Sequence, residues 1–243
     1  MSLTAALLDP LLAGPGAARP LVTYYDDATG ERIELSAVTT ANWAAKAANL
    51  LRDDCDVEPG TRVGILLPAH WQTAAVLLAA WSCGAEVAAP DGTGPAADWL
   101  LTDAANLRTA LDADPAGGIV ALSLDPFGKG LGDLPPGVVD FATEVRAHGD
   151  EFVPWEPVAD RALALDGEPV GVVLAQARQR AAELGIGTGD RVLSTLAWDT
   201  VPGLRDGLLA VLAAGASLVQ CRHPDPSRLD ARAAAEKVTH RLA

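Results

Sequence analysis

The chain has 243 residues, of which 49% are hydrophobic, so it is long enough to bury a core in one large domain or two small ones. It carries 32 acidic and 18 basic residues, a formal net charge of -14. Binding to nucleic acid or to an anionic membrane requires clustered Lys and Arg, so neither is an expected partner.

The cysteines and the apolar segments are typical of a cytoplasmic protein. Cys55, Cys83 and Cys221 are odd in number and far apart in the sequence, which favours reduced thiols. The four histidines are scattered, so we expect them at the surface or the edge of the core and expect no metal site. Met1 to Leu12 lacks the basic region and cleavage pattern of a signal peptide, and no apolar stretch is long enough to cross a bilayer.

In chain order, the hydrophobic pattern predicts alternating strands and helices. After a loose leader rich in Gly and Pro, two β-prone runs around the turn cluster at 26–30 predict a hairpin, and Ser36 can cap the helix that follows. The elements predicted up to residue 124 are strands at 21–25, 32–35, 62–67, 86–89, 99–102 and 119–124, and helices from Ser36 to the charged 52–54 segment, over 71–82 and over 104–111.

The composition changes over residues 125–157, where Pro, Gly and charged residues dominate and only 138–147 is expected to be ordered. From Pro169 the alternation resumes, with helices predicted at 172–184, 204–214 and 226–237 and strands at 191–195 and 217–221. This order predicts an α/β fold of mostly parallel sheets with helices on both faces. The predicted division is a first α/β lobe at 1–124, a connector at 125–157 and a second α/β lobe at 158–243, with one compact domain as the alternative.

Five segments, taken in order, carry a resemblance to a known family. They read VEPGTRVGILLP at 57–68, CGAEVAAPD at 83–91, GDRVLS at 189–194, LLAVLAAGASLV at 208–219 and EKVTH at 236–240. In sequence and spacing they resemble the N-terminal domain of the adenylate-forming superfamily, which contains acyl-CoA synthetases, amino-acid-adenylating domains and luciferases. The resemblance implies an α/β core and, for the family, activation of acids with ATP.

The resemblance also locates the family's phosphate-binding loop, which has the form TSGTTGxPKG. The corresponding residues here are Asp166, Gly167, Glu168, Pro169, Val170 and Gly171. The Ser/Thr run is absent, and Val170 occupies the lysine position. Asp166 and Glu168 place negative charge where a triphosphate would lie, at a cost on the order of 1 kcal/mol each. Unless Mg²⁺ bridges the carboxylates to the phosphates, we expect ATP to be disfavoured, with no catalytic residue and no cofactor.

Other parts of the family's domain have no counterpart in this sequence. The sequence ends just after EKVTH, where the family continues into its adenine-binding region and a C-terminal domain with a catalytic lysine. Residues 92–98 alone separate two predicted strands that the family joins through a helix. The resemblance therefore implies a shortened, degenerate N-terminal domain without the C-terminal domain.

Two pairs of residues are candidates for a pocket. Ser123 and Asp125 are two apart at a predicted strand end, so their side chains point to the same side, where ligands of parallel sheets dock; a capping or turn role is the alternative. Trp198 and Asp199 lie where the resembling enzymes present an aromatic residue or His beside the acyl pocket. Core packing of the indole is the alternative for Trp198.

From these observations we expect a non-catalytic, acyl-CoA synthetase-like protein that binds a small acyl-type or nucleotide-like molecule, or a protein partner, including a second copy in a homodimer. The alternative is an AMP-dependent synthetase or ligase, or a split subunit completed in trans by another polypeptide.

Overall fold

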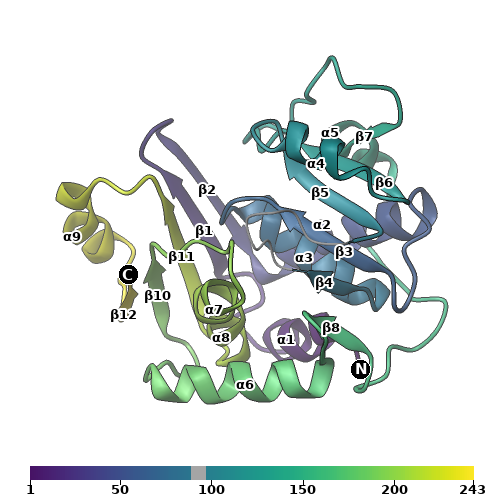
Figure 1. The fold of residues 1–243 in the computed structure, drawn as a ribbon. Coiled ribbons are helices and arrows are strands. Elements are labelled where there is room, and N and C mark those ends of the chain that lie inside the picture. The colour runs from purple at the N-terminus through teal and green to yellow at the C-terminus, as the bar shows by residue number, and fades with distance from the viewer. Residues whose placement is uncertain (89–96) are drawn as a thin grey trace.

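The computed structural model describes residues 1–88 and 97–243. The end of the strand predicted at 86–89, the last three residues of CGAEVAAPD and most of the 92–98 segment lie outside these ranges. Within them, the chain forms two sheets with helices between and around them (Figure 1).

The first sheet has the strand order β7 (Val138–Asp140), β6 (Gly118–Leu122), β5 (Trp99–Asp103), β3 (Arg62–Leu66), β4 (Glu86–Ala88), β8 (Leu163–Leu165) and β9 (Glu168–Pro169). The second has the order β12 (His240–Leu242), β10 (Arg191–Ser194), β11 (Ser217–Arg222), β1 (Pro20–Asp26) and β2 (Glu31–Ser36). Neighbouring strands are parallel except in the β8–β9 and β1–β2 pairs. The predicted α/β fold with mostly parallel sheets is confirmed.

The helices are α1 (Leu3–Leu12), α2 (Ala37–Asp53), α3 (Trp71–Cys83), α4 (Leu107–Ala113), α5 (Phe141–Glu144), the 3₁₀ turn η1 (Val145–Ala147), α6 (Val170–Glu183), α7 (Val201–Leu204), the π-helical turn η2 (Arg205–Leu209), α8 (Ala210–Ala213) and α9 (Pro226–Ala235). Helix α3 is apolar around most of its circumference and is buried almost throughout, as a helix in the middle of a core should be. It ends at Gly84, whose φ of 80° only glycine adopts without strain.

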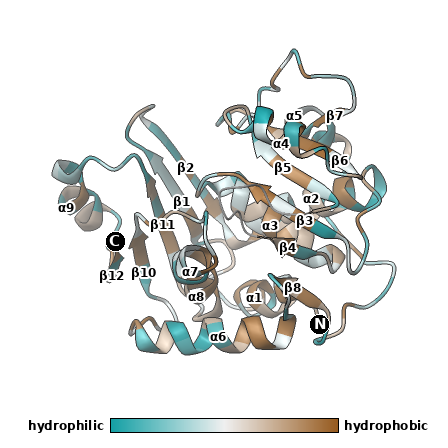
Figure 2. Cartoon of the chain, viewed as in Figure 1, coloured by the Kyte–Doolittle hydropathy of each residue, from teal (hydrophilic) through white to brown (hydrophobic). Residues whose placement is uncertain are grey.

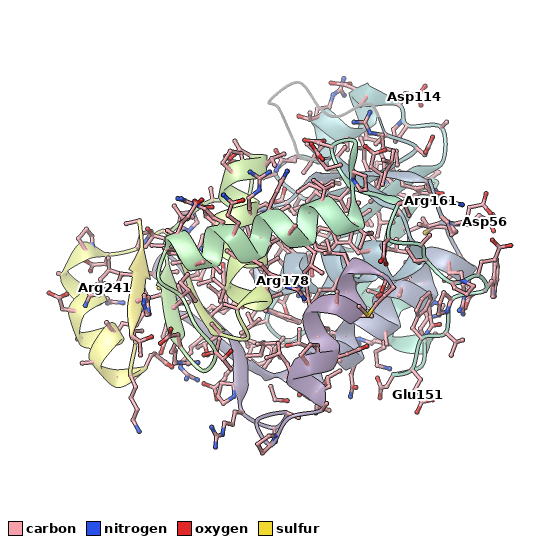
Figure 3. All side chains as sticks on the ribbon, turned by 90° about the horizontal axis from the view of Figure 1, so that it is seen from below. Asp56, Asp114, Glu151, Arg161, Arg178 and Arg241 are labelled. Carbon is pink, nitrogen blue, oxygen red and sulfur yellow. The ribbon has the colours of Figure 1, made fainter. Side chains whose placement is uncertain are left out.

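The main hydrophobic cluster joins the two sheets. It includes Leu21 and Leu218 of the second sheet, Val63 of the first, and Leu77 of α3 between them. The strands β10 and β11 and helices α1, α3 and α8 carry the hydrophobic colour where these elements meet (Figure 2). Charged side chains such as Asp56, Glu151 and Arg241 are exposed and point away from the body of the protein (Figure 3).

The N-terminal segment differs from the sequence prediction. A loose leader was expected, but residues 3–12 form α1, which Ser2 caps by accepting a hydrogen bond from the Ala5 amide at 3.2 Å. Leu3 and Leu7 are fully buried because α1 contacts α2, α3, α6 and α8 (Figure 1). Pro10 lies in the last turns of the helix, where it removes one backbone donor without preventing the preceding turns.

The sheets do not divide the chain at the predicted lobe boundaries. Strands β1 and β2 pair with β11 from the other end of the chain, and β8 joins β4. The predicted connector contains β7, α5 and η1. Its residues after η1 contact α2, where the Asn49 side-chain amide donates to the carbonyls of Gly149 at 3.1 Å and Glu151 at 2.8 Å. Long-range pairing thus ties all parts of the sequence into two shared sheets.

Candidate functional site

The residues that correspond to the family's phosphate loop form a tight β-hairpin. Leu165 pairs with Glu168, and Asp166 and Gly167 make the turn between them. Both turn residues have positive φ, 43° for Asp166 and 81° for Gly167, as type I′ hairpin turns require. In the family this segment wraps around phosphate groups, whereas here its two ends pair with each other as a hairpin.

The backbone amides of this turn donate to groups of the protein itself. The Gly167 amide donates to Oε1 of Glu86 at 2.8 Å, and the Asp166 amide donates to the Val87 carbonyl at 3.0 Å. The Glu86 side chain is 11% exposed, and the Arg62 guanidinium lies 3.6 Å from its Oε1. A carboxylate of the protein thus accepts the hydrogen bond that an incoming anion would need.

The first backbone amides of the following helix, α6, also have hydrogen-bond partners. Val170, in the family's lysine position, is the first residue of α6 and is buried. Its amide donates to the Ala162 carbonyl at 2.9 Å, and the Gly171 amide donates to the Asp160 carbonyl at 3.0 Å. Helix N-termini bind anions through amides without a partner, and these two have partners.

A polar pocket of about 290 Å³ lies where strands of both sheets end. Its walls include His70 and Asp103, which follow or end β3 and β5, and Asp26 and Arg222, which end β1 and β11. Carboxyl ends of parallel strands are where α/β proteins usually place ligands. The crevice between the sheets is therefore the main candidate for a binding site.

His70 is a deeply buried titratable group of this pocket, with a side chain 1% exposed. Its Nδ1 accepts a hydrogen bond from the Gln72 amide at 3.1 Å, so His70 caps α3. Burial lowers the pKa of His70, and Glu31 opposes that shift. The ring is therefore neutral near pH 7, with its proton on Nε2 because Nδ1 is an acceptor. Nε2 lies 3.6 Å from Oε1 of Glu31.

Two carboxylates of the pocket accept hydrogen bonds from within the protein. Asp26 accepts hydrogen bonds from the Ala28 amide at 2.8 Å and from His223 Nδ1 at 3.0 Å. Burial raises the pKa of Asp26, but these contacts outweigh it and leave the pKa below its usual value. The Asp103 carboxylate accepts from the backbone and side-chain amides of Asn106, both at 2.9 Å. Asp26 is therefore held ionised, and the hydrogen bonds fix the positions of both carboxylates.

The predicted pocket residue Trp198 lies in a neighbouring pocket of about 270 Å³, which also has Arg222 in its wall. Its side chain is 2% exposed, and its Nε1 has no hydrogen-bond partner among the described residues. The indole lies so close to the π-helical turn that a Cβ at Gly207 would be 2.6 Å from Nε1. Asp199 follows it in the same pocket wall and is exposed.

Ser123 and Asp125, predicted to lie on one side of a strand end, have different surroundings. Ser123 lies in the wall of the 290 Å³ pocket, and its hydroxyl accepts from the Asp125 amide at 3.2 Å. The Asp125 carboxylate accepts from the amides of Phe127 at 2.8 Å and Lys129 at 3.1 Å, which is the turn role considered as the alternative. The structure therefore brings Ser123, but not Asp125, to the polar pocket.

Sequence reasoning did not single out the residues that make this pocket polar. These are Tyr24, Asp26, Glu31, His70, Asp103 and Arg222. His70 was expected at the surface or core edge, whereas it is buried. The sequence feature that could have predicted them is their position at or just after the ends of apolar strands, because the carboxyl ends of parallel strands lie together at one edge of a sheet.

The crevice offers hydrogen-bonding groups. In residues 1–88 and 97–243, no group of three or more His, Cys, Asp or Glu side chains is arranged to hold a metal ion. Nδ1 of His70 bonds the Gln72 amide and Nε2 faces the Glu31 carboxylate at 3.6 Å, so neither nitrogen bonds a hydroxyl or thiol among the described residues. His70 is therefore not placed to activate a hydroxyl or thiol nucleophile among the described residues.

Solved structures with a similar fold include an acyl-CoA synthetase and CoA ligases. The Brucella canis acyl-CoA synthetase is 19% identical, with a TM-score of 0.80, and the match covers 99% of this chain and 47% of that one. A benzoate CoA ligase from Burkholderia xenovorans LB400 is 18% identical, with a TM-score of 0.72 and coverage of 96% and 48%. The chain thus spans about half the length of these enzymes, and the predicted resemblance is confirmed for the fold.

No protein-family model matches the chain. A full-length relative is the TIGR03089 family protein of Mycobacterium tuberculosis (strain ATCC 25618 / H37Rv), which is 51% identical over 245 residues. The alignment covers 99% of this chain and 98% of that protein. Identity at this level over nearly the whole of both chains means that the present chain belongs to the TIGR03089 family.

Proposed function

We propose that this protein is a non-catalytic, acyl-CoA synthetase-like binding protein that takes a small molecule into the crevice between its two sheets and does not activate acids with ATP. The observation that carries the proposal is the closed hairpin at Asp166 and Gly167. Its amides, and those that begin α6, donate to Glu86 and to backbone carbonyls. An ATP triphosphate would have to displace these partners and bind beside Asp166 and Glu168 without a lysine.

A thermal-shift and isotope-exchange experiment on the full chain tests this proposal. The chain is screened with ATP, AMP, CoA and acyl-CoAs, with and without Mg²⁺, and assayed for acid-dependent exchange of pyrophosphate into ATP. We expect no stabilisation by ATP and Mg²⁺ and no exchange, because a ligand stabilises a protein only if it binds the folded state. A shift of several degrees with ATP and Mg²⁺, or exchange that appears when a second polypeptide is added, would establish the alternative of a ligase or split subunit.

A protein partner is the second form that a binding role can take, and one exposed surface favours it. Val153 and Trp155 are 74% and 72% exposed, and Arg52 lies over the Trp155 ring at 5.4 Å from its centroid. Exposed aromatic and aliphatic side chains beside an Arg are common in interfaces. A solution mass twice that of the 25.0 kDa chain would indicate a homodimer, and Trp155→Ser should then return it to the monomer.

We also propose a cytoplasmic location. The support is that Cys55, Cys83 and Cys221 are all free and buried, as in proteins kept reduced. None of the helices in the described ranges has both the length and the apolar character that crossing a membrane demands.

A further inference from the structure

The segment of residues 148–156 lies along α2 and is fixed there through its backbone. Three side chains of α2, spaced three residues apart, donate to its carbonyls at distances between 2.6 and 3.1 Å: Lys46 to His148, Asn49 to Gly149 and Glu151, and Arg52 to Val153. Glu151, labelled in Figure 3, belongs to this segment and points away from the body of the protein. The segment forms no helix or strand, so these contacts with α2 hold its conformation.

This fixed segment exposes two large apolar side chains, those of Val153 and Trp155. Trp155 lies in the wall of a pocket of about 300 Å³, which shares Phe152 and Pro154 with a neighbouring pocket of about 420 Å³. Trp is enriched among the residues that dominate binding at interfaces. A surface that is ordered before binding also loses little conformational entropy when a partner arrives. We call Val153, Trp155 and the walls of these two pockets the Trp155 surface.

The unpaired charge at the Trp155 surface is negative. Glu58 and Glu156 lie in the wall of the 300 Å³ pocket and are exposed, and neither carboxylate pairs with another side chain within residues 1–88 and 97–243. Arg52 is the cation in the same wall, but each of its three guanidinium nitrogens already donates a hydrogen bond, and two of them donate to Asp53. The surface therefore attracts cationic groups and repels anionic ones.

This charge disfavours a second copy of the chain as the occupant. A two-fold dimer brings the same surface of both copies together, so Glu58 and Glu156 would lie near the same carboxylates of the other copy. Each copy also carries a formal net charge of -14. Like charges that face each other across an interface cost free energy, whereas Lys or Arg from a different protein would be attracted.

We propose that the Trp155 surface binds a segment of another protein that carries apolar side chains together with Lys or Arg. The apolar side chains pack into the two pockets around Trp155, and the cations pair with Glu58 and Glu156. The proposal rests on the protein-binding form of the function proposed above and specifies the chemistry of the partner.

A library of random peptides displayed on phage, selected on the full chain at physiological salt, tests the proposal. We expect the selected peptides to be enriched in Lys or Arg together with Leu, Phe or Trp, because such sequences complement both the pockets and the carboxylates. Selection of no peptide, or of acidic or purely polar peptides, would overturn the proposal. Sedimentation of the chain alone tests the other occupant: a dimer that Trp155→Ser dissociates would overturn the proposal but leave the protein-binding role in place.

Variants of the apolar residues locate the binding of the strongest selected peptide, which is synthesised and titrated by calorimetry. Trp155→Ser should weaken binding at least about tenfold. Val153→Ser should also weaken it, and this variant leaves the Arg52 contact with the Trp155 ring in place. Phe127→Ser is the matched control, since Phe127 is 91% exposed and lies in neither pocket wall. Equal binding by all three variants would mean that the acidic chain attracts the peptide without using this surface, and the proposal would be wrong.

The charge variants test the second half of the proposal. Glu58→Gln combined with Glu156→Gln should weaken binding and reduce its dependence on salt, because two attractive charges are lost. An unchanged salt dependence would show that these carboxylates do not pair with the peptide. Binding of ATP would contradict the non-catalytic function without bearing on this test, since ATP and the peptide are titrated separately.

Discussion

The Glu86 carboxylate accepts a hydrogen bond from the Gly167 amide at 2.8 Å and so links β4 to the hairpin that takes the place of a phosphate loop. Glu86 is 9% exposed, so the bond is shielded from water. Charge-assisted bonds of this kind are stronger than neutral ones. Negative charge supplied by the protein therefore holds the turn in its closed form.

Replacing Glu86 should loosen this turn. Glu86→Ala removes the acceptor, so we expect a loss of about 1–3 kcal/mol in the free energy of unfolding and faster hydrogen exchange at the Gly167 amide. Glu86→Gln keeps an acceptor oxygen at the same place and should preserve most of the protection. Unchanged exchange of the Gly167 amide in Glu86→Ala would show that the side chain does not hold the hairpin.

Gly167 itself should resist substitution because of its backbone conformation. A Cβ there would meet no atom within 4 Å, so the cost of Gly167→Ala comes from its φ of 81° alone. We expect a loss of about 1–2 kcal/mol in the free energy of unfolding, measured by denaturant titration. Gly149→Ala is the control, since Gly149 is equally free of close atoms and lacks positive φ. Equal stability of the two variants would contradict the type I′ turn.

Much of the fold could be predicted because local patterns specify it. The run at 62–67 and the apolar stretch at 71–82 are bounded by turn residues, and both elements form there. The Asp-Gly pair at 166–167 is a strong hairpin signal, and the hairpin forms there although these residues correspond to the family's longer phosphate loop. Helix α1 was missed because Pro10 argues against a helix, while its stability comes from burial of residues such as Leu7.

The pocket could not be predicted because its residues meet only through long-range packing. Glu31 belongs to a hairpin of the second sheet, whereas His70 follows a strand of the first. Nothing near either residue in the sequence indicates the other. Their proximity depends on β1 pairing with β11 and on α3 filling the space between the sheets, and single-sequence patterns do not specify such contacts.

Acid stability should depend on Glu236, whose side chain is 9% exposed. Burial raises the pKa of Glu236, but hydrogen bonds from Tyr25, Arg191 and Arg32 outweigh it and lower the pKa to about 2 from 4.5. The stabilisation is therefore complete above pH 4.5 and is lost as the pH falls toward about 2.

Glu236→Gln should accordingly lower the free energy of unfolding near pH 7 by on the order of 2–3 kcal/mol and flatten its fall below pH 4.5. Urea unfolding across this range measures both effects. Glu151→Gln is the control because Glu151 is exposed. A Glu236 variant with the same acid profile as the unmodified chain would argue against the network.

His70 should make stability depend on pH in a different range. Groups on three strands face its ring, Asp26 on β1, Glu31 on β2 and Arg222 on β11, but burial dominates and lowers the pKa of His70 from 6.5. The unfolded chain therefore takes up a proton at a higher pH than the folded one. Stability is complete above pH 6.5 and declines as the pH falls from there toward the lower pKa of the folded state.

Because His70 caps α3 through Nδ1, His70→Asn keeps a capping acceptor while removing the titrating ring. We expect this variant to lose the part of the decline in unfolding free energy that begins near pH 6.5, while the fall at lower pH caused by carboxylates such as Glu236 remains. Urea unfolding at closely spaced pH values measures the slope. If His70→Asn declines from pH 6.5 as the unmodified chain does, the ring of His70 is not held neutral by burial, and the donor assigned to Nε2 is wrong.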